Sequence, residues 1–383
     1  MSRELRGRAA IVGVAQNRIG EAPGWEAIEI LAEAARLALA DAGLSLREVD
    51  GLFTCSSFHY MPTLTVAEYL GIRPRFREGT VIGGSSFVHY LLPALLALES
   101  GQCEVALICY GSNQRSAGGR LATMSEPQPF EAPYGPRYPI SSYALAAARH
   151  MHEYGTTREQ LAEVAVAARQ WAMRNPEAFR REPLTIEEVL ASPMVSDPLS
   201  VRDCCLVTDG GGAVVLVRAE RAADHPKPPV YLLGCATAHW HRGILQMPDL
   251  TVTAATESGR RAFAMAGLGP DEMDVVELYD AFTINTILFL EDLGFCPKGE
   301  GGRFVEGGAI APGGRLPVNT NGGGLSCVHP GMYGIFLVIE AVRQLRGEAG
   351  DRQIEGAETA LVHGNGGVLS SQSTAVLGTA AVL

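Results

Sequence analysis

The sequence predicts an α/β protein made of two similar halves, and three observations support this prediction. Short apolar runs typical of buried strands alternate along the chain with longer stretches whose apolar residues recur at helical spacing. The 44 glycines gather where the predicted strands end, which suits functional sites on loops at those ends. Several sequence patterns of the first half also return in the second half, in the same order.

Composition describes an ordinary globular chain of 383 residues, of which 47% are apolar and 19% are charged. This length fits two domains or one large duplicated domain with ample core. The formal net charge of −11 argues against nucleic acid or an anionic membrane as the main partner. No apolar run is long enough to span a membrane and the start does not read as a signal peptide, so we expect a cytoplasmic protein.

The eight cysteines predict buried free thiols and no metal site. None of them forms a C-x-x-C pair, and no group of histidines and cysteines has the spacing of zinc ligands. An even number of cysteines says little about disulfides in a chain of this length without an export signal.

The first half alternates strands and helices. We expect, in order, a strand at 9–14, a helix at 25–42 that Gly43 ends, a strand at 49–54, a helix at 63–70, and strands at 80–82 and 105–110 on either side of a helix at 90–98. The loop 83–89, GGSSFVH, opens that last helix.

From 112 to about 200 the character of the chain changes. Glycine, proline, arginine and methionine are scattered through 115–138, and two amphipathic helices are expected at 141–154 and 158–172. This segment predicts a cap that is inserted in the first half and covers one face of the core. A strand at 210–217 then completes a first domain, 1–225.

The second domain, 226–383, restarts the pattern. We expect strands at 230–236 and 275–279, helices at 253–267 and 283–293, a glycine-rich loop to 314, an extended approach at 316–320, a helix at 335–342, and strands at 360–363 and 373–377.

Ordered sequence matches show that the second half repeats the first. The pattern AxAxAGLxxxExD occupies 38–50 and returns at 262–274, and GGxSxVH occupies 83–89 and returns at 323–329. Two βαβαβαββ halves related by pseudo-symmetry explain this order. In such sheets the sites lie at the carboxyl ends of the strands, here where the halves meet.

The segment 319–334, NTNGGGLSCVHPGMYG, is the strongest candidate for a site. Glycine is used where the backbone takes positive φ or passes close to a ligand. The glycine cluster therefore predicts that a tight loop presents His329 at the start of a buried helix. A structural histidine is the alternative, but the second copy of the pattern at 83–89 favours a functional role.

These features together resemble the thiolase superfamily, and most closely its sterol-carrier-protein-X type. The features are two similar halves, an inserted cap, a GG loop that opens a buried helix, the tetrad Tyr279–Phe282 (YDAF), the His329-Pro330 pair and a late glycine loop. The resemblance covers about 9–377. It implies a duplicated thiolase fold with αβαβα layers, acyl-CoA substrates and a homodimer.

The resemblance also implies roles for individual residues, but this sequence lacks the nucleophilic cysteine. The position of the thiolase nucleophilic cysteine is Gly84 here. Ser85 and Ser86 lie beside it and are expected to shape the loop, as a helix N-cap, rather than attack. His329 matches the histidine that forms an oxyanion hole for the thioester carbonyl.

Three more positions complete the predicted site. Tyr279 stands where thiolases carry the asparagine of Asn-Glu-Ala-Phe, and we expect it to transfer protons. His363 lies near the position of the second catalytic cysteine of thiolases, and the resemblance implies that it is an acid or base. Gly364 and Asn321 are expected, with Gly84 and both serines, to contact the substrate.

Without a nucleophile, the resemblance implies retro-aldol cleavage of a β-hydroxyacyl-CoA through an enolate, within lipid metabolism. Coenzyme A is then part of the substrate and no other cofactor is expected. The same resemblance implies a small zinc-ribbon/OB-fold partner protein. The alternatives are a thiolase that uses a displaced cysteine, with Cys327 as the candidate, and a non-catalytic acyl-CoA-binding or scaffold subunit of an acyltransferase complex.

Overall fold

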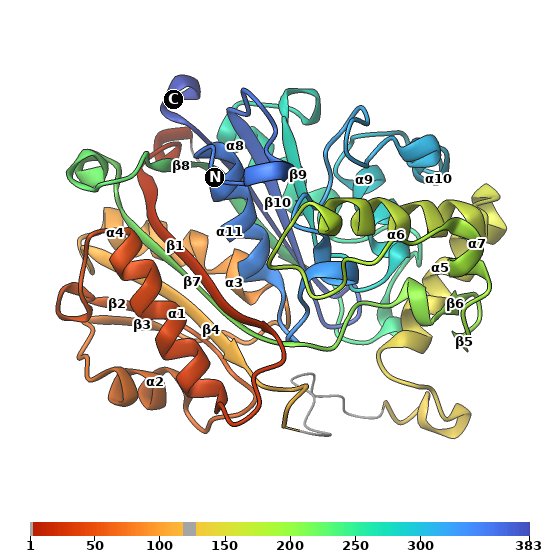
Figure 1. The fold of residues 1–383 in the computed structure, drawn as a ribbon, viewed down its shortest axis with the longest axis horizontal. Coiled ribbons are helices and arrows are strands. Elements are labelled where there is room, and N and C mark those ends of the chain that lie inside the picture. The colour runs from red at the N-terminus through yellow and green to blue at the C-terminus, as the bar shows by residue number, and fades with distance from the viewer. Residues whose placement is uncertain (1–2, 118–127) are drawn as a thin grey trace.

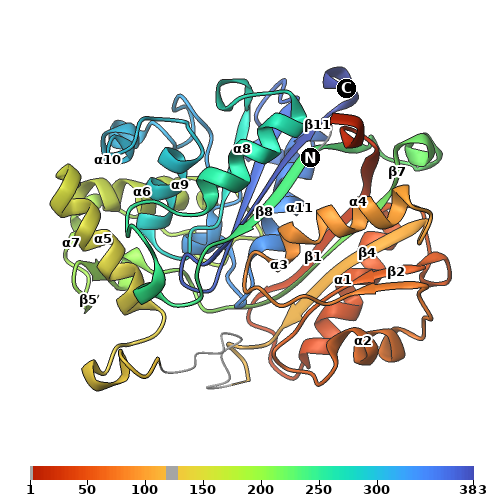
Figure 2. The ribbon, with the colours of Figure 1, turned by 180° about the vertical axis from the view of Figure 1, so that it is seen from behind.

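The computed structural model of the protein describes residues 3–117 and 128–383. Figures 1 and 2 show two groups of strands that meet near the middle of the molecule, with helices on their outer sides. The cap helices form a separate group beside the second half, in yellow-green (Figure 1). The part of the predicted cap at 118–127 lies outside the described residues.

Each half contributes a mixed sheet and its helices. The first half contains β1 (Ala9–Gly20), β2 (Gly51–Phe53), β3 (Phe76–Glu78), β4 (Val105–Ser112) and β7 (Asp209–Arg218), with α1 (Ala27–Asp41), α2 (Pro62–Leu70), α3 (Ser86–His89) and α4 (Leu91–Glu99). The second half contains β8 (Val230–His239), β9 (Val275–Leu278), β10 (Thr359–Gly366) and β11 (Ser371–Gly378), with α8 (Ala255–Ala266), α9 (Thr283–Asp292), α10 (Gly301–Phe304) and α11 (Gly334–Leu345).

The strand order repeats between the halves. The nine strands run β3-β2-β4-β7-β1-β8-β11-β10-β9, and β1 and β8 join through two residue pairs. A parallel bridge from Val276 to Val318 adds a position beyond β9. Read outward from the junction, each half therefore has two antiparallel neighbours followed by two parallel ones. This confirms the duplicated α/β fold, while the division at 225/226 stays a prediction.

Two aspartates show the duplication at the level of atoms. Asp50 accepts the backbone N–H groups of Glu104 and Val105 at 2.8 and 2.9 Å, at the start of β4. Asp274 accepts the corresponding groups of Glu358 and Thr359 at 2.8 and 3.0 Å, at the start of β10. The repeated acid of the AxAxAGLxxxExD pattern therefore anchors the same neighbouring strand in each half.

The helices form the predicted αβαβα layers. The central layer includes α11, which contacts β1 and β7 of one sheet and β9 and β10 of the other. The central layer also includes α3, which contacts α11, β10 and β11. Outside the sheets, α1 covers β1, β4 and β7, and α8 covers β8 and β11. The starts of α3 and α11 consequently meet between the two sheets.

The cap lies against the second half. It contains α5 (Ile140–Tyr154), α6 (Arg158–Met173), α7 (Ile186–Leu190), β5 (Met194–Ser196) and β6 (Leu199–Ser200). Trp171 of α6 donates its indole N–H to the carbonyl of Ile310 at 3.0 Å. His150 of α5 contacts the buried Glu291 carboxylate of α9 at 3.0 Å. These contacts fix both cap helices on the core.

One predicted element is misplaced. The strand expected at 80–82 lies at Phe76–Glu78, which pairs in parallel with β2. The apolar Val81 and Ile82 led to the error, because Val81 is exposed and not part of a sheet core. Sheet pairing of the preceding residues outweighed local hydrophobicity.

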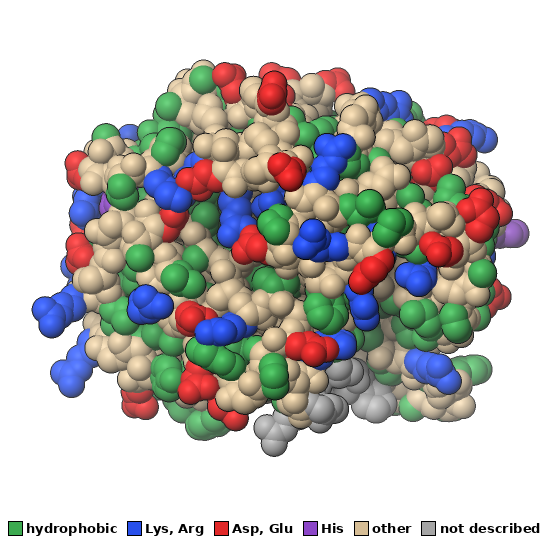
Figure 3. Space-filling model, viewed as in Figure 1, with side chains coloured by type: hydrophobic (Ala, Val, Ile, Leu, Met, Phe, Trp, Pro, Cys, Tyr) green, Lys and Arg blue, Asp and Glu red, His purple; other side chains and the backbone are tan. Residues whose placement is uncertain are grey.

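The described surface carries no broad basic area on the face seen in Figure 3, where acidic and basic side chains are intermixed. Among the helices in residues 3–117 and 128–383, none is long and apolar enough to cross a membrane.

Candidate active site

The segment 319–334 forms a tight turn that leads into α11. Residues Gly323–Cys327 make a single π-helical turn. The backbone at Gly322 and Gly323 has positive φ angles of 101° and 65°, which glycine adopts without steric cost. A short π-turn of this kind is often found at functional sites.

Asp280 holds this turn in place. Its carboxylate accepts the backbone N–H groups of Gly324 and Leu325 at 2.6 and 3.2 Å. A Cβ at Gly323 would lie 2.0 Å from the same carboxylate, so that position requires glycine. Burial raises the pKa of Asp280 to about 7 despite these donors. The glycine at 323 therefore allows the turn to close on Asp280, whereas the sequence suggested closeness to a ligand.

His329 follows the turn with one ring nitrogen unpaired. Its backbone N–H donates to Thr208 Oγ1 at 3.0 Å, and its carbonyl accepts from Gln114 Nε2 at 2.8 Å. The ring is buried, and within the described residues its Nε2 has no hydrogen-bond partner. Burial lowers the pKa of His329 to about 4, so the imidazole is neutral at physiological pH. A fixed, unpaired ring nitrogen is suited to bind a substrate oxygen.

Tyr279 follows the last residue of β9 and lies beside His329. Its backbone N–H donates to the carbonyl of His363 on β10 at 2.9 Å. Its phenolic oxygen accepts the N–H of Tyr333 at 3.1 Å and donates to the carbonyl of Gly331 at 3.2 Å. The rings of Tyr279 and His329 are perpendicular, with centroids 5.6 Å apart. Burial raises the pKa of Tyr279 well above its ordinary value, so the phenol is protonated.

The structure brings Gly84 into direct contact with Tyr279. A Cβ built on Gly84 would lie 2.2 Å from the phenolic oxygen and 2.3 Å from two ring carbons. These separations are far below van der Waals contact. The space of a side chain at Gly84 is therefore filled by the phenol of Tyr279.

The hydroxyl groups of Ser85 and Ser86 close the loop. Ser85 Oγ contacts the carbonyl of Ile82 at 3.0 Å and Ser371 Oγ at 2.8 Å. Ser86 Oγ donates to the carbonyl of Gly83 at 2.7 Å and accepts the N–H of Ile82 at 3.0 Å. Ser85 occupies the N-cap position of α3, as expected, but its hydroxyl makes no capping hydrogen bond to the helix. Both serines shape the loop, and both lack a neighbouring base among these contacts.

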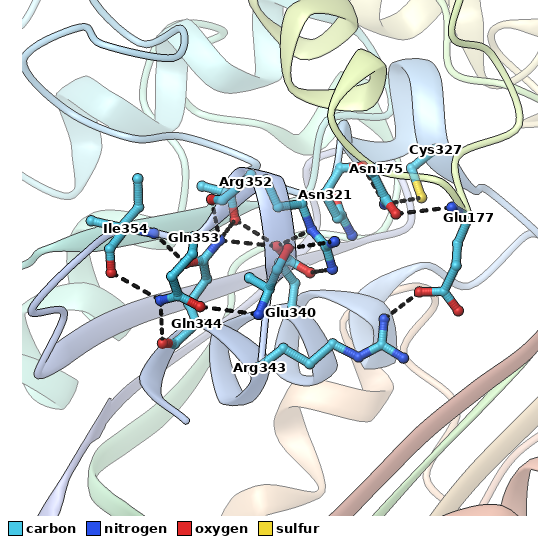
Figure 4. Close-up of polar contacts among 12 residues, drawn as sticks. Asn175, Glu177, Asn321, Cys327, Glu340, Arg343, Gln344, Arg352, Gln353 and Ile354 are labelled. Carbon is cyan, nitrogen blue, oxygen red and sulfur yellow. Dashed lines mark hydrogen bonds and ion pairs between the residues drawn. The ribbon is translucent and has the colours of Figure 1, made fainter. Parts of the chain in front are cut away.

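Burial raises the pKa of every cysteine thiol in the chain: Cys55, Cys103, Cys109, Cys204, Cys205, Cys235, Cys296 and Cys327. Cys327 lies in the π-turn, where its Sγ accepts from Asn175 Nδ2 at 3.6 Å (Figure 4). Its thiol therefore contacts a residue that follows the cap helix α6. None of the eight thiols has the lowered pKa of a reactive nucleophile.

His363 is not part of the site that the structure assembles. Its Nδ1 is 2.9 Å from Thr374 Oγ1 and its Nε2 is 2.9 Å from Gln372 Oε1. The ring also packs against Phe289 of α9, with centroids 4.5 Å apart. Because strand residues alternate between faces, His363 points to the outer helices while Gly364 faces α3. Both ring nitrogens of His363 are thus paired with other side chains, and the acid or base role expected for it stays a prediction.

Gly364 and Asn321 lie in different surroundings. A Cβ at Gly364 would lie 3.0 Å from Val88 and 3.1 Å from Ser85, so this glycine permits close packing of β10 on α3. Asn321 Oδ1 accepts from the N–H of Gly323 at 2.7 Å. Its Nδ2 is buried and has no partner within the described residues. Asn321 thus offers a second unpaired donor near the turn.

Tyr333 is a site residue that the sequence did not identify. Its backbone N–H binds the phenolic oxygen of Tyr279, and its own hydroxyl donates to Asn321 Oδ1 at 3.1 Å. Its ring stacks near His329, with centroids 6.1 Å apart. The signal available was a tyrosine between two glycines, four residues after His329 and one before α11.

A buried polar network supports the turn from the side of α11 (Figure 4). Arg352 contacts the Glu340 carboxylate through two nitrogens at 2.8 and 2.9 Å. Thr320 Oγ1 lies 2.8 Å from both Glu340 and Glu277, and Gln344 Nε2 donates to it at 2.9 Å. The Arg352 guanidinium offsets the burial of Glu340 and holds its pKa low. This network fixes the chain just before Asn321.

Comparison with known proteins assigns the family. Residues 236–379 match the family model described as Thiolase C-terminal domain-like. The chain is 37% identical over 374 residues to an acetyl-CoA acetyltransferase of Methanothermobacter thermautotrophicus, covering 94% of this chain and 96% of the relative. It is 34% identical over 366 residues to a steroid side-chain-cleaving aldolase of Thermomonospora curvata, covering 90% and 91%.

A solved structure, the Ltp2-ChsH2(DUF35) aldolase, is 33% identical and superposes with a TM-score of 0.89 over 98% of both chains. The chain therefore belongs to the thiolase superfamily. Within it, the protein is a thiolase-like acyl-CoA enzyme. Over 233 residues it is also 34% identical to sterol carrier protein 2 of Bos taurus, of which it covers 42%.

Proposed function

We propose that the protein cleaves the bond between Cα and Cβ of a β-hydroxyacyl-CoA by retro-aldol chemistry, without an acyl-enzyme. The observation that carries the proposal is the phenol of Tyr279 in the space of a side chain at Gly84. A site with no nucleophile there cannot bond to the acyl carbon, but it can still stabilise an enolate. The aldolase names of two similar proteins support this proposal.

The proposed reaction is balanced without oxidant or reductant. The β-hydroxyl loses its proton and becomes a carbonyl as the bond between Cα and Cβ breaks. The bonding electrons move to Cα and the thioester oxygen, which forms an enolate. In the same step, as enolate character develops, a proton reaches Cα and gives a ketone or aldehyde and a shorter acyl-CoA.

In this mechanism His329 and Tyr279 have separate tasks. The neutral imidazole of His329 donates its unpaired Nε2–H to the thioester oxygen as charge develops there. Such a preorganised donor contributes on the order of 3 kcal/mol to catalysis. The oxygen of Tyr279 takes the β-hydroxyl proton while its own proton passes to Cα. Because burial keeps this phenol neutral, Tyr279 relays a proton and is not deprotonated to a phenolate.

The two alternatives make different demands on the structure. A displaced-cysteine thiolase needs an activated thiol, whereas burial raises the pKa of Cys327 and its Sγ contacts Asn175. The acetyltransferase name of one relative keeps this alternative worth testing. A non-catalytic scaffold subunit does not require an unpaired ring nitrogen at His329 or a phenol beside it.

We further propose that the enzyme forms a homodimer along β3. The strand predicted for pairing, 105–110, lies inside the sheet between β2 and β7, so it cannot pair with another chain. β3 is the edge strand of the first half. Large apolar side chains lie exposed near it in sequence, at Tyr60, Met61, Leu64 and Val81. Exposed apolar side chains gathered beside a sheet edge are typical of a surface that binds another chain.

Other aspects of the proposal concern partners and surroundings. The two-part name of the Ltp2-ChsH2(DUF35) aldolase supports a partner protein for this chain too. We propose a small zinc-ribbon/OB-fold protein in that role. Coenzyme A enters as part of the substrate, and no further cofactor is proposed. All eight cysteines are free, which fits a reducing cytoplasm.

Two assays test the proposed reaction. Purified protein, alone and with any partner, is incubated with a panel of β-hydroxyacyl-CoAs, and carbonyl products and shortened acyl-CoAs are measured by mass spectrometry. We expect equal amounts of both products and no covalent acyl group on the protein after a single turnover with acetyl-CoA. An acyl thioester on any cysteine would contradict the proposal.

A further inference from the structure

A ladder of side-chain hydrogen bonds crosses one face of the β10–β11 hairpin. In this hairpin His363 pairs with Thr374, and Asn365 pairs with Gln372. Alternation along the strands places these four polar side chains on the same face. The ladder ends on Tyr143, which reaches it from the cap helix α5. All five side chains are buried.

The ladder has one direction of donation. His363 Nε2 meets Gln372 Oε1 at 2.9 Å, and since an amide oxygen only accepts, this ring nitrogen carries the proton. Gln372 Nε2 donates to Asn365 Oδ1 at 2.8 Å, and Asn365 Nδ2 donates to the Tyr143 oxygen at 2.8 Å. The proton of Tyr143 is then left for the carbonyl of Gly367, at 2.9 Å. Each hydrogen bond in the ladder therefore determines which atom of the next side chain donates.

The end of the ladder touches the candidate active site from two sides. Gly367, in the turn between β10 and β11, is so close to Gly83 that a Cβ on Gly83 would lie 2.6 Å from the Gly367 nitrogen. The Tyr143 ring also packs on Phe282, the last residue of the YDAF tetrad, with centroids 4.4 Å apart. Tyr143 therefore contacts Gly367, which lies beside Gly83 of the GG loop, and also Phe282, three residues after Tyr279.

We propose that this ladder is a positioning device for the acyl-CoA site. His363, acting through Gln372 and Asn365, orients the hydroxyl of Tyr143, and Tyr143 fixes the hairpin turn beside the GG loop. His363 thus serves the site without touching the reacting atoms. The inference rests on the proposed function, because the GG loop is where that function places the thioester.

Two variants test the ladder through the Michaelis constant. Tyr143→Phe deletes the hydroxyl that binds Gly367 and should raise KM for a β-hydroxyacyl-CoA about tenfold, the effect of one lost hydrogen bond. Gln372→Glu keeps the acceptor for His363 but removes the donor to Asn365. The Asn365 amide then turns over and takes the Tyr143 proton, so this isosteric change should give a similar rise in KM. For both variants kcat should stay within about threefold of the native value.

The double variant shows whether the two residues act in series. If Gln372 acts through Tyr143, the combined change should raise KM no more than Tyr143→Phe alone. If the increases in KM of the two single variants multiply in the double variant, the two residues act independently and the proposed ladder is wrong. Ser258→Ala is the matched control, because Ser258 bonds Thr374 at 2.8 Å at the outer end and its loss leaves the ladder's direction unchanged. Its KM should stay native, and a rise equal to that of Tyr143→Phe would mean general packing damage.

Two measurements separate this inference from the proposed reaction. Nitrogen NMR at pH 6 should show His363 as the neutral tautomer protonated at Nε2, and an Nδ1-protonated ring would overturn the ladder. Calorimetry with a non-cleavable CoA thioether should show the same tenfold weakening in Tyr143→Phe. If native protein cleaves no β-hydroxyacyl-CoA while both results hold, the proposed function fails and the ladder stands.

Discussion

At the residue scale, the site depends on groups whose ordinary chemistry is changed by burial. His329 is held neutral, Tyr279 is held protonated, and both keep contacts that fix their orientation. The pairing of Tyr279 with Gly84 could not be read from either position alone, because it joins strand β9 of one half to a loop of the other. The phenol leaves no room for a nucleophilic side chain at position 84.

Replacement of His329 tests enolate stabilisation. His329→Ala removes the donor aimed at the thioester oxygen, so kcat should fall by about 10²–10³ while KM changes far less. Steady-state kinetics with a cleavable β-hydroxyacyl-CoA measures both constants. His225→Ala is the control, since His225 binds the Ala42 carbonyl outside the site. A KM effect without loss of kcat would instead assign His329 to substrate binding.

The same residue predicts a pH dependence of stability. The pKa of His329 falls from 6.5 to about 4 on burial, so its contribution to stability is complete above pH 6.5 and is lost as pH falls toward 4. Between pH 7 and pH 5 this loss is about 2 kcal/mol. Urea unfolding of His329→Gln should show a pH dependence smaller by that amount. Equal dependence in both proteins would mean that the imidazole is not held neutral.

At the element scale, the π-turn at Gly323–Cys327 decides where His329 points. The glycine cluster in the sequence predicted a tight loop correctly. It could not predict that Asp280, 43 residues before Gly323, would bind the turn, because that contact depends on how the second-half sheet folds. The surroundings of His363 were not predictable for a related reason, since one residue of strand register changes the face on which a side chain lies.

Two glycines with similar φ angles separate the effect of crowding by a side chain from that of left-handed strain. Gly323 and Gly71 have φ of 65° and 68°, but a Cβ at Gly323 would lie 2.0 Å from Asp280, whereas a Cβ at Gly71 would meet nothing within 4 Å. Gly71→Ala should cost about 1 kcal/mol of unfolding free energy from left-handed strain alone. Gly323→Ala should cost several-fold more and lower kcat. Equal costs in chemical denaturation would show that Asp280 does not constrain the turn.

At the scale of the whole molecule, duplication was the most predictable feature. The repeated AxAxAGLxxxExD pattern makes the same contacts in both halves, because Asp50 and Asp274 anchor equivalent strands. The site was less predictable because it forms where the halves meet, between residues far apart in the chain. Tyr333 and Tyr143 were missed because their partners lie far along the chain: the Tyr333 N–H binds Tyr279 within the second half, and the Tyr143 hydroxyl reaches from the cap to Gly367 of the second half.

If the protein is a dimer through β3, a substitution beside this edge strand should lower the molecular mass of the particle in solution. Val81 is 58% exposed and lies three residues after β3. Val81→Glu should place a charge in the interface and convert a dimer at micromolar concentration to monomer, as sedimentation velocity would show. Leu245→Glu is the control, because Leu245 is 55% exposed in the second half. Native protein that sediments as a monomer with full activity would refute the proposed dimer.

The central claim is that carbon–carbon cleavage here uses a phenol in place of a thiolate nucleophile. The most direct test compares the rates at which Tyr279→Phe and Cys327→Ser cleave a β-hydroxyacyl-CoA. Tyr279→Phe keeps the ring in the space beside Gly84 but removes the proton that is relayed, so the rate should fall about 10²-fold with the fold intact. Cys327→Ser should retain nearly full activity, because its thiol is buried against Asn175. If Cys327→Ser abolishes activity and Tyr279→Phe spares it, the enzyme is a thiolase with a displaced cysteine and the retro-aldol mechanism is wrong.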